Sequence, residues 1–162
     1  MKLFREHTLS AYSRQLSLKI PAPGGGSAAA LVAAIGSSLM CMVVRYSQKR
    51  KHSRAVESRL ADCLRRAEKI RRRLLVLVDL DAKAYLQLTK TPKTDAVRYA
   101  QALRRAQAVP LEIGKLCYAA IQLTPFLARK GNPYLLSDVR CAVEMLLAAF
   151  QSAMANVEAN QR

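Results

Sequence analysis

Hydrophobic residues recur along most of the chain at intervals of three and four positions, which is the spacing of one face of an α-helix. Prolines, glycines and capping residues divide this pattern into segments, and none of the segments alternates like a half-buried strand. We therefore predict an all-α fold in which residues 1–162 form one domain, a bundle of long antiparallel helices. Helices are expected at about 8–18, 27–48, 53–88, 95–108, 111–130 and 137–160.

Prolines and caps set the expected helix ends. Pro110 either starts a new helix or kinks a continuing one, and Pro125 is predicted to be a second kink. Gly131 is expected at a helix C-terminus, and Ser137 is expected to cap the last helix. In the first helix, Leu9, Tyr12 and Leu16 share one face, which is predicted to pack inward.

The longest segment carries an acidic residue in its apolar stripe. Residues at seven-residue intervals define that stripe: Leu60, Ala67, Leu74, Asp81 and Leu88. Asp79 points roughly 200° away around the same helix. A carboxylate among core leucines must be paired, hydrogen-bonded or protonated. Asp81 is therefore either a general acid or base with a raised pKa or one half of a structural salt bridge.

A glycine-rich loop precedes the second helix, in the sequence PAPGGGS at residues 21–27. Ser27 is placed to cap that helix, and a helix N-terminus behind a flexible loop can bind a carboxylate or phosphate. The alternative is that the glycines only let two helices approach closely. Small residues continue along the helix and are typical of close helix packing: Ala29, Ala33, Gly36 and Ser37.

Two other clusters are candidates for site residues. Asn132, Ser137 and Asp138 surround a turn between helices, although Ser and Asp are also ordinary residues for the start of a helix. Asn156 lies inside the last helix, where it could hydrogen-bond a ligand or a neighbouring backbone group.

The uncharged stretch from Ile20 to Val44 has the composition of a membrane span but not its continuity. Prolines and glycines fill its first third, and the remainder is barely long enough to cross a bilayer. A buried core helix is the better interpretation, and no signal peptide is expected.

Charge and cysteine usage bear on partners and compartment. The chain has 27 Lys and Arg against 11 Asp and Glu, a net charge of +16, which implies anionic partners. The four cysteines are far apart, form no CxxC motif and are expected to be buried free thiols in a reducing, cytoplasmic setting. The spacing of His7 and His52 does not favour a metal site.

Several motifs occur together in a specific order. They are PAPGGGSAAALVAAIGSSLMCMV, KRKHSRAVE, LVDLDAKAYLQL, RAQAVPLEI, KGNPYLLSDVRCAV and MANVEAN. In combination they resemble the cyclodeaminase/cyclohydrolase family, which comprises the C-terminal domain of formiminotransferase-cyclodeaminase and stand-alone bacterial methenyltetrahydrofolate cyclohydrolases. The resemblance covers nearly the whole chain.

The resemblance implies a helical homodimer that acts on a tetrahydrofolate derivative, with no metal or redox cofactor. The expected reaction is hydrolysis of 5,10-methenyltetrahydrofolate to the 10-formyl compound or cyclising deamination of 5-formiminotetrahydrofolate. Asp81 is the expected catalytic residue, with Asp138 second. The expected substrate-binding residues are Gly24, Gly25, Gly26, Ser27, Asn132, Ser137 and Asn156, with Lys49 and Lys51 on the glutamate tail of a polyglutamylated folate.

The chain also departs from the family pattern. It ends at Arg162 and is expected to lack the family's last C-terminal helix, and His52 and Ser53 replace residues of the family's basic run. A catalytically inactive relative that serves as a binding or scaffold protein is therefore an alternative. A basic helical nucleic-acid-binding protein is a weaker one, because no stacking aromatics or nucleic-acid motif accompany the charge.

Overall fold

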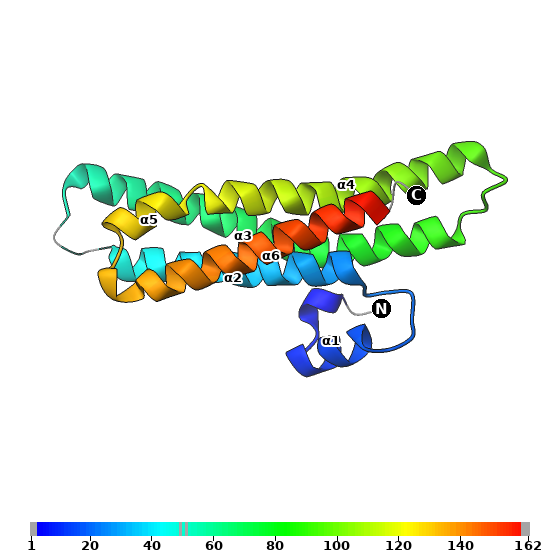
Figure 1. Cartoon of the computed structure of the whole chain (residues 1–162), viewed down its shortest axis with the longest axis horizontal. Coiled ribbons are helices and arrows are strands. Elements are labelled where there is room, and N and C mark those ends of the chain that lie inside the picture. Colours follow the sequence, from blue (N-terminus) through cyan, green and yellow to red (C-terminus); the bar gives the residue numbers. More distant parts are fainter. Residues whose placement is uncertain (1–2, 49, 51, 160–162) are drawn as a thin grey trace.

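The computed structural model describes residues 3–48, 50 and 52–159, and no strand occurs within these ranges. Four long helices form an antiparallel bundle: α2 (Gly25–Ser47), α3 (Arg54–Lys90), α4 (Ala96–Ile121) and α6 (Leu136–Ala159). Each packs against two neighbours, in the cyclic order α2, α3, α4, α6 (Figure 1). The predicted all-α bundle is confirmed.

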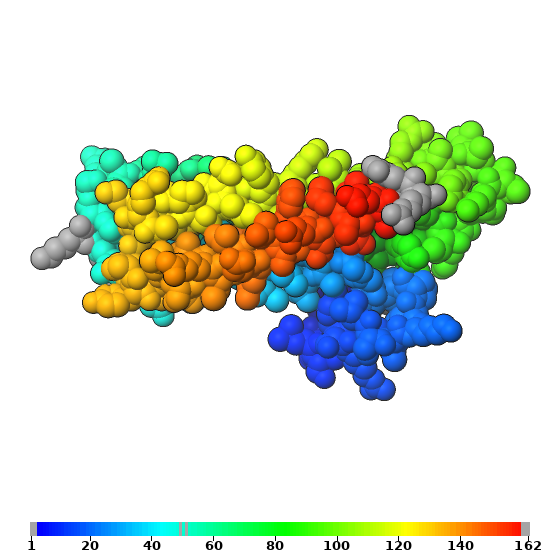
Figure 2. All heavy atoms as spheres, viewed as in Figure 1, coloured from blue at the N-terminus to red at the C-terminus, as the bar shows by residue number. Residues whose placement is uncertain are grey.

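The N-terminal segment lies outside the four-helix bundle. It contains a 3-10 turn, η1 (Phe4–Glu6), and a short helix, α1 (Leu9–Leu16), capped by the Thr8 hydroxyl. In Figures 1 and 2 this segment forms a small projection beside the beginning of α2. The predicted inward face of α1 is wrong in part, because Leu9 is 75% exposed, Leu16 is 38% exposed and only Tyr12 is buried. A helix this short packs through one side chain.

Helix α2 is a core helix of this fold. By length and composition Gly25–Ser47 could cross a membrane, but 61% of its most apolar window is buried inside the bundle. Its small-residue stripe packs closely against α6: a Cβ on Gly36 would lie 3.2 Å from the Ala142 carbonyl oxygen and from the Leu146 side chain. The predicted helix-packing role of this stripe is confirmed.

Several predicted helix ends are wrong. Of the two alternatives for Pro110, the start of a new helix is wrong, because α4 continues through this buried proline. Pro125 lies at the first turn of a separate helix, α5 (Thr124–Lys130), where its missing N–H removes no helix hydrogen bond. Gly131 follows α5 as predicted. The 3-10 turn η2 (Pro133–Leu135) leads directly into α6, so Ser137 lies within the first turn of α6 and is not its cap.

Three of the four cysteines are buried as predicted, namely Cys41, Cys63 and Cys117. Cys141 is exposed, against the prediction, because its position on α6 faces away from the core. The core itself is built from leucines, valines and alanines of all four bundle helices, among them Leu60, Leu74, Ile113 and Leu146, each of which has no exposed surface.

The bundle is longer on one side than on the other. The hairpin formed by the end of α3 and the beginning of α4 extends past both the start of α2 and the end of α6 (Figure 1). The beginning of α2 and the end of α6 therefore meet against the sides of two continuing helices. The candidate site lies where the start of α2 and the end of α6 meet the longer helices α3 and α4.

Candidate functional site

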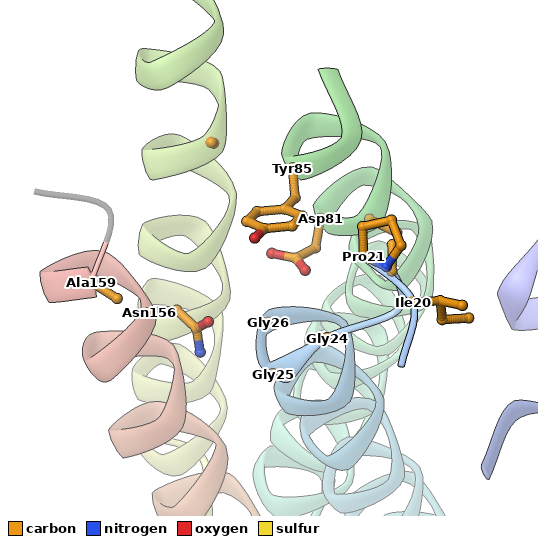
Figure 3. A pocket seen from close by; sticks show the side chains of 12 residues that line it. Ile20, Pro21, Gly24, Gly25, Gly26, Asp81, Tyr85, Asn156 and Ala159 are labelled. Carbon is orange, nitrogen blue, oxygen red and sulfur yellow. The ribbon is translucent and has the colours of Figure 1, made fainter. Parts of the chain in front are cut away.

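A pocket of about 340 Å³ opens where α2 begins and α6 ends. Pockets of this volume are typical of small-molecule sites. Figure 3 shows the glycine turn of α2 and the acidic side of α3 on one side, with α6 on the other. The lining residues are Ile20, Pro21, Ala22, Gly24, Gly25, Gly26, Asp81, Ala82, Tyr85, Ala106, Asn156 and Ala159.

Asp81 is the acidic residue of this pocket. Its place in the apolar stripe of α3 turns it toward the first turn of α2, where it accepts a hydrogen bond from the backbone N–H of Ser27. Burial raises the pKa of Asp81 to about 6, although the Ser27 hydrogen bond lowers it. The structure therefore favours a carboxyl group that changes protonation near neutral pH over a salt bridge, because the ion pairs of the described residues do not include Asp81.

The first turn of α2 lies beside Asp81 in the pocket wall. Gly24 occupies the N-cap position without a side-chain cap, and Gly25 and Gly26 begin the helix. The predicted cap role of Ser27 is wrong: Ser27 is the third helical residue, and its hydroxyl lies 2.9 Å from the hydroxyl of Tyr12. The helix offers no internal acceptor for its first N–H groups, so the amides of Gly25 and Gly26 are suited to a polar ligand.

Room for the Asp81 carboxyl group depends on the absence of a side chain at Gly26. A Cβ on Gly26 would lie within 2.8 Å of all three carboxyl atoms of Asp81. By contrast, nothing lies within 4 Å of a Cβ on Gly24. The glycine run is thus compatible with both interpretations, close helix packing and ligand binding. It permits close approach of α3 and leaves backbone amides at the pocket.

Asn156 and Tyr85 complete the polar part of the site. Asn156 lies in the pocket as predicted; its Nδ2 donates to the Ser152 carbonyl oxygen at 2.8 Å, and a Cβ on Gly25 would lie 3.3 Å from that nitrogen. Tyr85, one turn after Asp81, has its ring beside the Asp81 carboxylate in Figure 3 and is 43% exposed. Tyr85 was not among the predicted site residues, although it lies only four residues after Asp81 in the same segment.

Other predicted site residues are not brought to this pocket. Asp138 and Ser137 lie in the first turn of α6, 18 residues before Asn156, which corresponds to about 27 Å along the helix. Asn132 is also at that end, where its backbone N–H donates to the Ser47 hydroxyl at 2.8 Å. Lys49 and Lys51 lie outside the described residues.

Comparisons with known proteins agree with the resemblance seen in the sequence. Residues 8–162 match the family model described as formiminotransferase-cyclodeaminase. The methenyltetrahydrofolate cyclohydrolase of Methylorubrum extorquens is 33% identical over 96% of this chain and 79% of its own length. The chain belongs to the formiminotransferase-cyclodeaminase family.

The family assignment extends to the fold. The crystal structure of formiminotetrahydrofolate cyclodeaminase from Thermotoga maritima matches with a TM-score of 0.92 and 27% identity, covering 96% of this chain and 79% of that one. Mouse formimidoyltransferase-cyclodeaminase is 34% identical over 94% of this chain, which spans 30% of the mouse protein.

Asp79 shows why only one acidic residue of the family-like DLDA segment reaches the pocket. It lies on the other side of α3, where its Oδ1 accepts the Phe4 N–H at 2.6 Å and its Oδ2 lies 3.4 Å from the Arg5 guanidinium. Within the described part of the chain, no group of three His, Cys, Asp or Glu side chains is arranged to hold a metal ion. The pocket itself presents the Asp81 carboxyl group, the Asn156 carboxamide and backbone amides, which can transfer protons and form hydrogen bonds.

The raised pKa of Asp81 predicts how stability depends on pH. The folded protein holds the Asp81 proton up to about pH 6, whereas the unfolded chain releases it near the ordinary value of 3.8. The contribution of Asp81 to the free energy of unfolding should therefore decrease as pH rises from 4 to above 6, by up to roughly 3 kcal/mol relative to a variant without this carboxyl group. Urea unfolding at several pH values should show this decrease in the wild type but not in Asp81→Asn. An identical pH dependence in the two proteins would contradict the shift.

Proposed function

We propose that this protein is an enzyme of folate one-carbon metabolism. Its reaction is either hydrolysis of 5,10-methenyltetrahydrofolate to 10-formyltetrahydrofolate or cyclising deamination of 5-formiminotetrahydrofolate to the 5,10-methenyl compound. The observation that carries the proposal is the half-buried Asp81, whose pKa is about 6, beside the glycine-lined N-terminus of α2. Relatives named for both activities support it.

Hydrolysis requires a base that acts on water. Water adds to the methenyl carbon between N5 and N10, and Asp81 in its ionised form accepts the proton that water loses. The carbinol hydroxyl then loses its proton as the bond from this carbon to N5 breaks, N5 takes up a proton, and the formyl group stays on N10, so that one proton is released overall. The carboxylate also stabilises the delocalised cation of the substrate electrostatically.

Deamination uses the same carboxyl group as an acid. N10 attacks the formimino carbon, and the proton lost by N10 is gained by the former imine nitrogen. Asp81 in its protonated form then donates a proton to that nitrogen, so that ammonia leaves and the methenyl cation remains. Since a group with a pKa near 6 is present in both forms near neutral pH, Asp81 suits either direction of proton transfer.

The remaining pocket groups hold the substrate. The amides of Gly25 and Gly26 bind polar atoms of the folate, and the Asn156 carboxamide does so from α6. Neither reaction transfers electrons, so we propose no redox cofactor, and we propose no metal because Asp81 supplies the proton transfers.

The test is turnover by the purified chain on each substrate. Loss of the methenyltetrahydrofolate absorbance faster than the uncatalysed rate would establish cyclohydrolase activity. Ammonia release from formiminotetrahydrofolate, with appearance of the methenyl absorbance, would establish cyclodeaminase activity. Absence of both from folded protein would contradict the proposal and favour the inactive relative that acts by binding.

The positive charge supports a polyglutamylated substrate, and the buried free thiols of Cys41, Cys63 and Cys117 support the cytoplasmic location that we propose. Folate tails carry carboxylates, which a net charge of +16 attracts over a distance that depends on salt. The same charge attracts nucleic acid without sequence preference, so we propose no specific nucleic-acid partner and no membrane partner.

A second copy of the chain is the proposed macromolecular partner. The outward side of α2 has no charged residue from Gly25 to Val44, and Val32 and Ile35 on it are 37% and 44% exposed. A homodimer that covers this side would bury apolar surface. Asp138, with Asn132 and Ser137, could reach an Asp81 pocket only if the second copy presented the other end of its bundle there.

A further inference from the structure

The N-terminal segment touches two of the helices that form the pocket, α2 and α3. Its Phe4 N–H and Arg5 guanidinium contact Asp79 of α3, and its Tyr12 hydroxyl lies 2.9 Å from the Ser27 hydroxyl of α2. Figure 1 shows the segment against the start of α2, outside the bundle. The segment adds little to the core, so its contacts are concentrated on the two helix turns beside Asp81.

Tyr12 connects the N-terminal segment to Asp81 through Ser27. The Tyr12 side chain is buried, with 6% exposure, and Ser27 has no exposed surface. The Ser27 hydroxyl meets Tyr12, while the backbone N–H of the same Ser27 donates to the Asp81 carboxylate. Anything that shifts Ser27 therefore changes a hydrogen bond received by Asp81.

We propose that Tyr12 is a positioning residue, which holds the first turn of α2 through the Ser27 hydroxyl so that the Ser27 amide stays directed at the Asp81 carboxylate. The inference rests on the proposed role of Asp81 in proton transfer. Tyr12 itself does not line the pocket, so its hydroxyl positions Asp81 through the α2 turn. Its ring stands edge-to-face with Phe4, at 6.3 Å between centroids, which fixes the position of the phenol.

The effect of the Tyr12–Ser27 contact should be measurable as a change in the pKa of Asp81. The titratable groups near it are Tyr12 from α1 and Tyr85 from α3, while α4 and α6 line the pocket with Ala106, Asn156 and Ala159; Asp79 lies on the other side of α3. Burial raises the pKa of Tyr12, so the phenol stays protonated near neutral pH. Because the Ser27 N–H lowers the pKa of Asp81, a loosened Ser27 should raise it.

The experiment uses Tyr12→Phe, which removes the hydroxyl and keeps the ring against Phe4. In folded protein, titration of the Asp81 carboxyl carbon by NMR should give a pKa at least about half a unit higher than in the wild type. The kinetic pKa near 6 should rise equally, and kcat at a fixed pH should change severalfold while KM changes less than about twofold. A merely structural role would lower Tm and leave both pKa values unchanged, which would overturn the proposal.

Two further variants keep the result unambiguous. Ser27→Ala retains the backbone N–H but loses the hydroxyl, so it should reproduce the shift, and the double variant should show no additional shift. Tyr118→Phe, at an exposed tyrosine of α4, should change neither pKa. If the wild type turns over neither folate, the proposed function fails, whereas the NMR titration still decides whether Tyr12 positions Asp81.

Discussion

Replacement of Asp81 by Asn is expected to reduce kcat by roughly 10²- to 10⁴-fold, the range that a general acid or base contributes. Asn has nearly the same shape as Asp and can still accept the Ser27 N–H hydrogen bond, but it cannot gain or lose a proton near neutral pH. The helical circular dichroism should be unchanged. Initial rates on whichever folate the wild type converts would measure the loss, with KM determined separately.

The matched control for this variant is Asp62→Asn on the same helix. Asp62 is 41% exposed at its side chain and pairs with the neighbouring Arg65, far from the pocket along α3. It should keep wild-type kcat and KM. If Asp81→Asn turned over at a rate near that of Asp62→Asn, Asp81 would have no part in proton transfer and the proposed mechanism would be wrong.

Asp81 was predictable because the spacing of α3 is regular over its whole length. A seven-residue repeat of apolar residues places position 81 on the inward side without knowledge of any other helix, and the structure confirms a carboxyl group among buried groups. Asn156 was predictable on weaker grounds, as a poor helix former within a helix. The motif order identified the family, which the comparisons confirm.

Other features depend on contacts between distant segments, which periodicity does not contain. Ser27 has the residue type of a cap, yet the helix begins two residues earlier because Asp81 and Tyr12, from two other helices, bind its amide and its hydroxyl. Asp138 fits the family motif, but distance along α6 separates it from Asp81 within one chain. Leu9 was placed on the packed side of α1 from spacing alone, yet it is 75% exposed.

Gly26→Ala is expected to lower kcat by roughly 100-fold, the effect of misplacing a reacting group by about 1 Å. The added Cβ would overlap the Asp81 carboxyl group, so either that group moves away from the Ser27 amide or the first turn of α2 withdraws. The stability change should be small by comparison, because better helix propensity of Ala offsets part of the overpacking. The Asp81 carboxyl pKa and kcat, measured on the same preparation, would detect the displacement.

Gly24→Ala separates crowding of Asp81 from crowding of the substrate. Its backbone angles, φ −130° and ψ −161°, are extended and suit any residue, and nothing lies within 4 Å of the added Cβ. We expect the Asp81 pKa to change in Gly26→Ala and to stay at its wild-type value in Gly24→Ala. Equal loss of activity in both variants, with an unchanged Asp81 pKa in both, would mean that the glycines serve close approach of the folate to the backbone. Wild-type kcat in Gly26→Ala would show that the carboxyl group needs no fixed place beside α2.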